Sequence, residues 1–154
     1  MNIVNIKNTM EHFDSLAEYH QNEWAHLTED ETLTERKIRM QEYLCEDFIP
    51  SIFLAKDKEL YGSAAIVKCD MSTKPHLSPW LASVFVLPLH RGKGIGKLLV
   101  EHIMHKAKEN GISKMYLYTE TAEGLYAKLG WTTISREVYN DEPVIIMELD
   151  LLRK

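Results

Sequence analysis

The stretch that decides the fold runs from residue 84 to residue 99 and reads Val84-Phe85-Val86-Leu87-Pro88-Leu89-His90-Arg91-Gly92-Lys93-Gly94-Ile95-Gly96-Lys97-Leu98-Leu99. Its first residues are apolar, as in a strand that is covered on both faces. Its last residues begin the apolar period of an amphipathic helix. Between them lie three glycines at alternate positions, which allow the backbone to turn sharply and to approach a ligand closely. The stretch predicts a buried strand, a glycine-rich turn and a long helix, in that order.

The glycine-rich turn is suited to binding an anion. The first turn of a helix leaves backbone N–H groups unpaired and carries the positive end of the helix dipole. Arg91, Lys93 and Lys97 add positive charge around these groups. Phosphate or pyrophosphate is the ligand that such a turn favours. The alternative is a turn that only connects a strand tightly to a helix.

Two common nucleotide-binding motifs fail on spacing. A Walker A loop needs Ser or Thr after its Gly-Lys pair, but Leu98 follows Lys97, and Arg91 stands where the first glycine is required. The dinucleotide motif G-x-G-x-x-G needs its last glycine three residues after the second, whereas Gly96 follows Gly94 by two. These departures disfavour a kinase, an NTPase and a Rossmann-type enzyme.

The rest of the chain predicts one domain, residues 1–154, in which helices surround a sheet. The expected strands are residues 2–7, 51–56, 60–68, 80–87, 114–119, 131–139 and 144–151, the last two joined by a turn at 140–143. The expected helices are one that Thr9 caps and that continues to Leu27, residues 32–44 with a Thr32/Glu35 capping box, residues 95–109, and residues 121–129. This order predicts an α/β (α+β) fold, a three-layer sandwich whose mixed central sheet is mostly antiparallel.

Composition narrows the function classes. Acidic residues number 23 against 18 basic ones, for a net charge of -5, which argues against a nucleic-acid partner. Cys45 and Cys69 lack the paired spacing of a zinc site, and no metal is expected. The sequence shows no apolar run long enough to span a membrane. We therefore expect a soluble cytoplasmic protein without a membrane partner.

Two motifs together resemble one family. Residues 91–96, Arg-Gly-Lys-Gly-Ile-Gly, fit the pattern [Q/R]-x-x-G-x-[G/A] between a strand and a helix. Residues 125–131, Leu-Tyr-Ala-Lys-Leu-Gly-Trp, follow at about the usual distance and fit L-Y-x-K-L-G-[F/W]. On these motifs the chain resembles the GNAT superfamily of N-acetyltransferases, most clearly from Trp80 onward. The resemblance implies the acyl-CoA N-acyltransferase fold.

The resemblance also implies a donor site for acetyl-CoA as co-substrate. The pyrophosphate is expected on the turn formed by Arg91, Gly92, Lys93, Gly94, Ile95, Gly96 and Lys97. The pantetheine arm is expected along Val84, Phe85 and Val86, where a strand parted from its neighbour has backbone groups to offer. The Val86 N–H is a candidate to polarise the thioester carbonyl.

The family's mechanism implies direct attack of a primary amine on the thioester in a ternary complex. Tyr126 falls on the position of the usual proton donor to the thiolate, since a phenol of reference pKa near 10 can protonate a thiolate of pKa about 8.5. The alternative for an aromatic side chain on a short helix is core packing. Some relatives carry a glutamate in the strand before the second motif, but residues 115–119 hold no carboxylate. The general base is left unassigned among a water chain and the side chains Glu120, Asp70, His76, His90 and Glu142.

The acceptor is less defined. Glu23, Trp24 and the loop 76–80 are candidates to line its pocket, and Thr119 and Thr121 to flank the cofactor end. The acidic run Glu29-Asp30-Glu31 could attract an amine, although such runs are usually solvated. A small-molecule or peptide amine is the expected partner of a monomer or homodimer. A non-catalytic acyl-CoA-binding or regulatory domain is the competing hypothesis.

Overall fold

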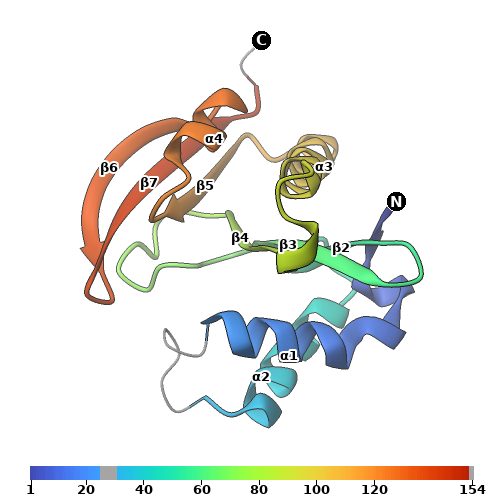
Figure 1. The fold of residues 1–154 in the computed structure, drawn as a ribbon. Coiled ribbons are helices and arrows are strands. Elements are labelled where there is room, and N and C mark those ends of the chain that lie inside the picture. Colours follow the sequence, from blue (N-terminus) through green and yellow to red (C-terminus); the bar gives the residue numbers. More distant parts are fainter. Residues whose placement is uncertain (25–30, 153–154) are drawn as a thin grey trace.

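The computed structural model describes residues 1–24 and 31–152, which form one seven-stranded sheet with helices on both faces (Figure 1). The strands are β1 Asn2–Asn5, β2 Ser51–Lys56, β3 Leu60–Val67, β4 Trp80–Val86, β5 Lys114–Thr119, β6 Thr132–Tyr139 and β7 Glu142–Asp150. The helices are α1 Phe13–Trp24, α2 Leu33–Met40, α3 Ile95–Glu109 and α4 Glu123–Lys128, with short 3-10 turns at Ile6–Asn8, Met10–His12, Gln41–Leu44 and Pro88–His90. The spatial order of the strands is β1-β2-β3-β4-β5-β7-β6, in which only the β4–β5 pair is parallel.

The sheet separates two apolar cores. Alternate residues of β2 point to opposite faces, as the strand geometry requires. Ile52 and Leu54 join the cluster beneath α1 and α2, whereas Phe53 and Ala55 join the cluster beneath α3. Figure 1 shows α1 and α2 on one face and α3 and α4 on the other. The predicted three-layer sandwich with a mixed, mostly antiparallel sheet is confirmed.

Local sequence signals place most element ends. The capping box forms as predicted, because the Thr32 hydroxyl accepts from the Glu35 N–H and the Glu35 carboxylate accepts from the Thr32 N–H. The strand 114–119 and the helix 95–109 have the predicted bounds. The prediction for Thr9 was wrong: its hydroxyl donates to Glu11, and α1 begins only at Phe13 after a 3-10 turn. Leu27, placed on the same helix, lies outside the described residues.

Three predicted elements are shorter than expected. The first strand ends at Asn5 and is followed by a 3-10 turn, α2 ends at Met40 because residues 41–44 form a 3-10 turn, and α4 covers only Glu123–Lys128.

The last hairpin and β4 also differ from the prediction. The last hairpin turns over Asn140 and Asp141 alone, both with positive φ (50° and 65°), and β7 already begins at Glu142. Asn and Asp tolerate this conformation, so a two-residue turn suffices. Strand β4 ends at Val86, and its second half is only partly covered. The reason is that β4 loses its β5 neighbour there.

Strands β4 and β5 part after a single pairing. In the described part of the sheet they are in register only at Trp80 and Tyr116. Between the β3–β4 pairs Ala65↔Ala82 and Ser63↔Phe85, two β4 residues, Ser83 and Val84, face one β3 residue, so β4 carries a bulge. A bulge bends its strand, and here β4 bends away from β5. The gap that results positions the functional site.

Candidate active site

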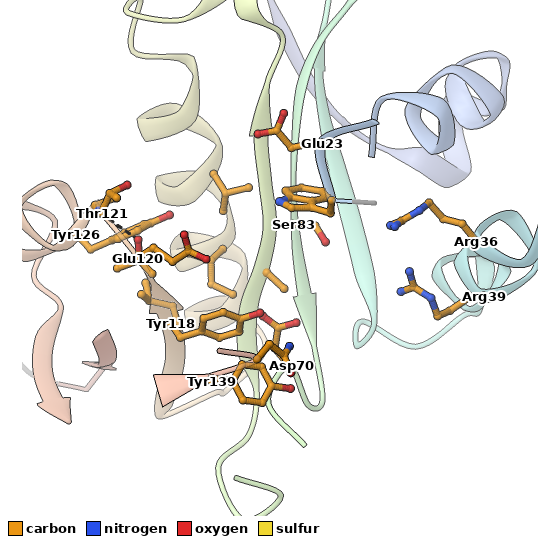
Figure 2. Close-up of a pocket in the computed structure, with 18 residues that line it drawn as sticks. Glu23, Arg36, Arg39, Asp70, Ser83, Tyr118, Glu120, Thr121, Tyr126 and Tyr139 are labelled. Carbon is orange, nitrogen blue, oxygen red and sulfur yellow. Dashed lines mark hydrogen bonds between the residues drawn. The ribbon is translucent and has the colours of Figure 1, made fainter. Parts of the chain in front are cut away.

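A cavity of about 610 Å³ fills the gap between β4 and β5 (Figure 2). Its walls come from α1, α2, both parted strands, the loop after β3, the start of α4 and the last hairpin. The lining residues are Glu23, Trp24, Arg36, Arg39, Asp70, Leu81, Ala82, Ser83, Val84, Leu117, Tyr118, Thr119, Glu120, Thr121, Ala122, Tyr126, Tyr139 and Asn140. The cavity thus brings together elements that are distant in the sequence.

The glycine-rich turn is open to a ligand. Gly92 and Gly94 have φ of 80° and 79°, a left-handed conformation that favours glycine, and a Cβ added at either would meet no atom within 4 Å. Helix α3 follows directly, with Gly94 as its N-cap and no side chain bonded to its first N–H groups. Lys93 and Lys97 are exposed and take part in none of the ion pairs among the described residues. Open amides beside two available ammonium groups fit a pyrophosphate.

Arg91 lies differently from its neighbours in the turn. Its Nε donates to the Val86 carbonyl oxygen over 2.8 Å, and its guanidinium lies 3.5 Å from the Glu23 carboxylate and 5.9 Å from the Phe85 ring centroid. The side chain therefore joins the end of β4 to the end of α1. Its backbone remains part of the turn. We therefore expect Arg91 to contribute its backbone N–H, and not its guanidinium, to pyrophosphate binding.

The three β4 residues expected beside pantetheine have different surroundings. Val84 lines the cavity. The Phe85 side chain is buried instead against α1, with ring centroids 6.2 Å from Tyr19 and 6.0 Å from Trp24. The Leu87 N–H bonds to Tyr61 on β3, so antiparallel alternation directs the N–H and C=O of Val86 away from β3, toward the gap. The Val86 carbonyl oxygen accepts from Arg91 there, so the N–H is the Val86 group that can face a ligand. An outward N–H on a parted strand fits an amide carbonyl of a pantetheine arm.

Tyr126 reaches the cavity from α4, as the second motif predicts. Its side chain is largely buried and meets the Trp131 ring edge-to-face at 6.2 Å. Burial raises the pKa of Tyr126, so the phenol keeps its proton at neutral pH. Figure 2 shows Tyr126 at the same side of the cavity as Thr121 and Glu120.

Two of the five side chains considered as base line the cavity. Asp70 and Glu120 do so, whereas His76, His90 and Glu142 do not. Burial raises the pKa of Asp70 to about 7, although the positive charge of Arg39 acts in the opposite direction. Asp70 therefore changes protonation near neutral pH, where a general base is most effective. Figure 2 shows Tyr118 and Tyr139 beside Asp70, and the ring centroids of these two tyrosines lie 5.5 Å apart.

The acceptor side is only partly as expected. Glu23, Trp24, Thr119 and Thr121 line the cavity, but the loop 76–80 does not, because Trp80 is fully buried and its indole N–H bonds to Leu77. Of the acidic run, Glu31 pairs with Arg39 at 3.0 Å, and Glu29 and Asp30 lie outside the described residues.

Sequence reasoning missed Arg36 and Arg39, whose side chains point from α2 toward the cavity in Figure 2. Arg36 donates to Gln21 on α1 over 2.6 Å. Basic residues on a polar helix usually indicate a solvent-exposed face, and no signal in the sequence indicates that this helix flanks a cavity. Tyr118, Tyr139 and Ser83 were missed for the same reason, since they occur on strands whose neighbours only the fold defines.

Among the described residues, no group of three or more His, Cys, Asp or Glu side chains could hold a metal ion. No helix within residues 1–24 and 31–152 has the length and apolarity needed to cross a membrane.

Solved structures of acetyltransferases have the same fold as this chain. A crystal structure of an aminoglycoside 6'-acetyltransferase type Ii matches with a TM-score of 0.77 and 21% identity, covering 100% of this chain and 99% of that one. An aminoglycoside 6'-N-acetyltransferase complexed with coenzyme A matches with a TM-score of 0.77 and 18% identity over the same shares of the two chains. At these identities the likeness shows a common fold.

Comparison by sequence gives a shorter match and a longer one. A protein of Bacillus subtilis (strain 168) that is assigned as an acetyltransferase is 39% identical over 62 residues, which are 40% of this chain and 42% of that protein. The model of the Acetyltransferase (GNAT) family matches residues 11–131. GNAT acetyltransferases use acetyl-CoA, so the expectation for the co-substrate is confirmed. Since the family model spans well over half of the sequence, and both motifs stand in place, this chain belongs to the GNAT acetyltransferase family.

Proposed function

We propose that this protein is an N-acetyltransferase that transfers the acetyl group of acetyl-CoA to a primary amine bound in the 610 Å³ cavity. One observation carries the proposal: β4 and β5 part beside the open glycine turn, and the resulting cavity has Tyr126 and a carboxylate in its wall. The turn amides of residues 91–97 would hold the pyrophosphate. The β4 backbone at Val84–Val86 would pair with the pantetheine arm and present the thioester to the cavity.

The residues of this cavity have the properties that direct transfer needs. Asp70, with its raised pKa, takes a proton from the acceptor's ammonium group, which leaves a neutral amine. The amine nitrogen attacks the thioester carbonyl, so a C–N bond forms and the C–S bond breaks. Tyr126 gives its proton to the departing thiolate and regains one from the nitrogen through solvent. The sum is one amide, one thiol and one proton released from Asp70.

The charges of the cavity support a cationic acceptor. Glu23 is paired with Arg91, and Arg39 with Glu31. Within residues 1–24 and 31–152, Asp70 and Glu120 take part in no ion pair. An ammonium group is the natural complement of these two carboxylates. Two structural neighbours act on aminoglycosides, so such compounds belong in any acceptor screen.

The test is an acetyl-transfer assay with thiol release as the readout. Acetyl-CoA is incubated with the protein and a panel of aminoglycosides, polyamines, amino acids and peptide N-termini, and mass spectrometry identifies the acetylated product. We expect release above background hydrolysis with at least one amine. Tight binding of acetyl-CoA without release across the panel would favour the non-catalytic acyl-CoA-binding domain. Binding of ATP in competition with coenzyme A at the turn would instead favour a nucleotide enzyme.

A further inference from the structure

The bulge in β4 needs something to hold it. Ser83 has φ of 52°, in the left-handed region that residues other than glycine rarely adopt. This conformation is unfavourable for a residue with a Cβ, because the Cβ then crowds the backbone. Such a residue persists only where its surroundings fix it.

A buried hydrogen-bond chain from α1 ends on this residue. The Ser63 hydroxyl on β3 donates to the Ser83 carbonyl oxygen over 3.0 Å, and His20 Nε2 on α1 lies 2.9 Å from the Ser63 oxygen. Ser63 and His20 are both almost completely buried. Neither group touches the outer solvent, so the chain is part of the core between α1 and the sheet.

The direction of each bond in the chain follows from counting protons. A carbonyl oxygen can only accept, so the single hydroxyl proton of Ser63 goes to Ser83. The bond between His20 and Ser63 must then use a proton on Nε2, which fixes the tautomer of the ring. Burial, together with the charges of Arg36 and Arg39, lowers the pKa of His20 to about 3, so the ring stays neutral and keeps this tautomer at ordinary pH.

The histidine ring is itself held in place. Its centroid lies 4.8 Å from that of Trp24 and 5.9 Å from that of Phe85, both in edge-to-face geometry. Phe85 is two residues beyond the bulge on β4, and Trp24 lines the cavity. The chain therefore ties the wall of the cavity on α1 to the point where β4 leaves β5.

We propose that His20 and Ser63 are positioning residues that hold the Ser83 bulge and so keep the β4 backbone at Val84–Val86 available to the pantetheine arm of acetyl-CoA. This inference rests on the donor site proposed above. It adds a role for residues that touch neither substrate and that lie outside both sequence motifs.

The test separates the two halves of the donor. Calorimetry measures the affinity of the wild-type protein and of Ser63→Ala for acetyl-CoA and for adenosine 3'-phosphate 5'-diphosphate, which has the phosphates but no pantetheine. Ser63→Ala removes both hydrogen bonds of the chain, so we expect acetyl-CoA to bind about tenfold more weakly. The affinity for the pantetheine-free nucleotide should stay unchanged, because the turn is intact.

Ser51→Ala is the matched control. Ser51 is also a buried serine that donates to a backbone carbonyl, that of Phe48, but it lies at the start of β2. It should lower stability without changing either affinity. His20→Phe keeps an aromatic ring and removes the N–H, and it serves as the second variant if Ser63→Ala does not fold; it too should weaken acetyl-CoA selectively.

Three results would overturn the inference or its basis. Unchanged acetyl-CoA affinity in a folded Ser63→Ala or His20→Phe protein would remove the positioning role. An equal loss for both ligands would also remove it, because the effect would then be general rather than confined to β4. A wild-type protein that binds neither ligand would refute the proposed donor site itself.

Discussion

The buried neutral His20 makes a quantitative prediction about stability and pH. An unfolded chain exposes this histidine, which then has its ordinary pKa of 6.5, whereas in the folded protein the pKa is about 3. Because the folded pKa is lowered, the stability that comes from the neutral ring is complete above pH 6.5. It is lost progressively as the pH falls from 6.5 toward 3.

The size of the effect follows from the distance to the unfolded pKa. At pH 5 the solution is 1.5 units below 6.5, and each unit corresponds to about 1.36 kcal/mol, so the wild-type protein should lose about 2 kcal/mol from this group between pH 8 and pH 5. Asp70 acts in the opposite direction, since its pKa is raised in the folded state and its carboxyl gains a proton there as the pH falls through 7. The comparison must therefore be made against a variant that lacks only the histidine.

The assay is urea unfolding of wild type and His20→Phe, followed by tryptophan fluorescence at several pH values. Phenylalanine does not titrate, and the contributions of Asp70 and of the other histidines cancel in the difference between the two proteins. The wild type should lose about 2 kcal/mol more than the variant between pH 8 and pH 5, with similar m-values. His20→Gln should flatten the curve in the same way. A difference that stays constant across this range would refute the reasoning, because His20 would then not be held neutral by burial.

Three further predictions concern the reaction and the turn. Tyr126→Phe should lower kcat about a hundredfold with acetyl-CoA affinity unchanged, measured by thiol release and calorimetry, whereas Tyr116→Phe should not; full turnover in Tyr126→Phe would reject the acid role. In the wild type, kcat/KM should rise with a midpoint near pH 7 as the Asp70 carboxyl loses its proton, and Asp70→Asn should remove this rise. Asp141→Asn, in the exposed hairpin turn, should retain it. A rise that persists in Asp70→Asn would exclude Asp70 as base. Gly94→Ala should weaken acetyl-CoA binding and lower the free energy of unfolding by about 1–2 kcal/mol, because the φ of Gly94 is +79°, a conformation that is strained for alanine even where its Cβ meets no other atom. Gly124→Ala in α4 should do neither. Wild-type affinity in Gly94→Ala would show that the turn does not need a left-handed glycine.

The candidate site for acetyl-CoA can be predicted from the sequence, whereas the candidate site for the acceptor cannot. The proposed donor site uses backbone amides, which any sequence has, and the residues that expose these amides are glycines at fixed spacing next to a helix start. The proposed acceptor site is lined by side chains from α1, α2, the loop after β3 and the last hairpin. These segments lie far apart in the sequence, from α1 to the hairpin at Asn140, and no spacing rule relates them.

What the sequence determined by itself is therefore local. The glycine turn, the helix 95–109, the capping box at Thr32 and the second motif around Tyr126 each depend on residues within a few positions of one another, and the structure has all of them. Those signals were enough for the three-layer fold and the family.

Only the tertiary structure decided the rest. It placed Asp70 and Glu120, but not the other candidate bases, in the cavity wall. It also turned the Arg91 side chain back onto β4 and brought Arg36 and Arg39 to the cavity. It also revealed the bulge at Ser83, which no glycine or proline in β4 indicates. That bulge is held by His20 and Ser63, which are 43 residues apart, and a hydrogen bond between such distant residues exists only once the sheet and α1 have packed together.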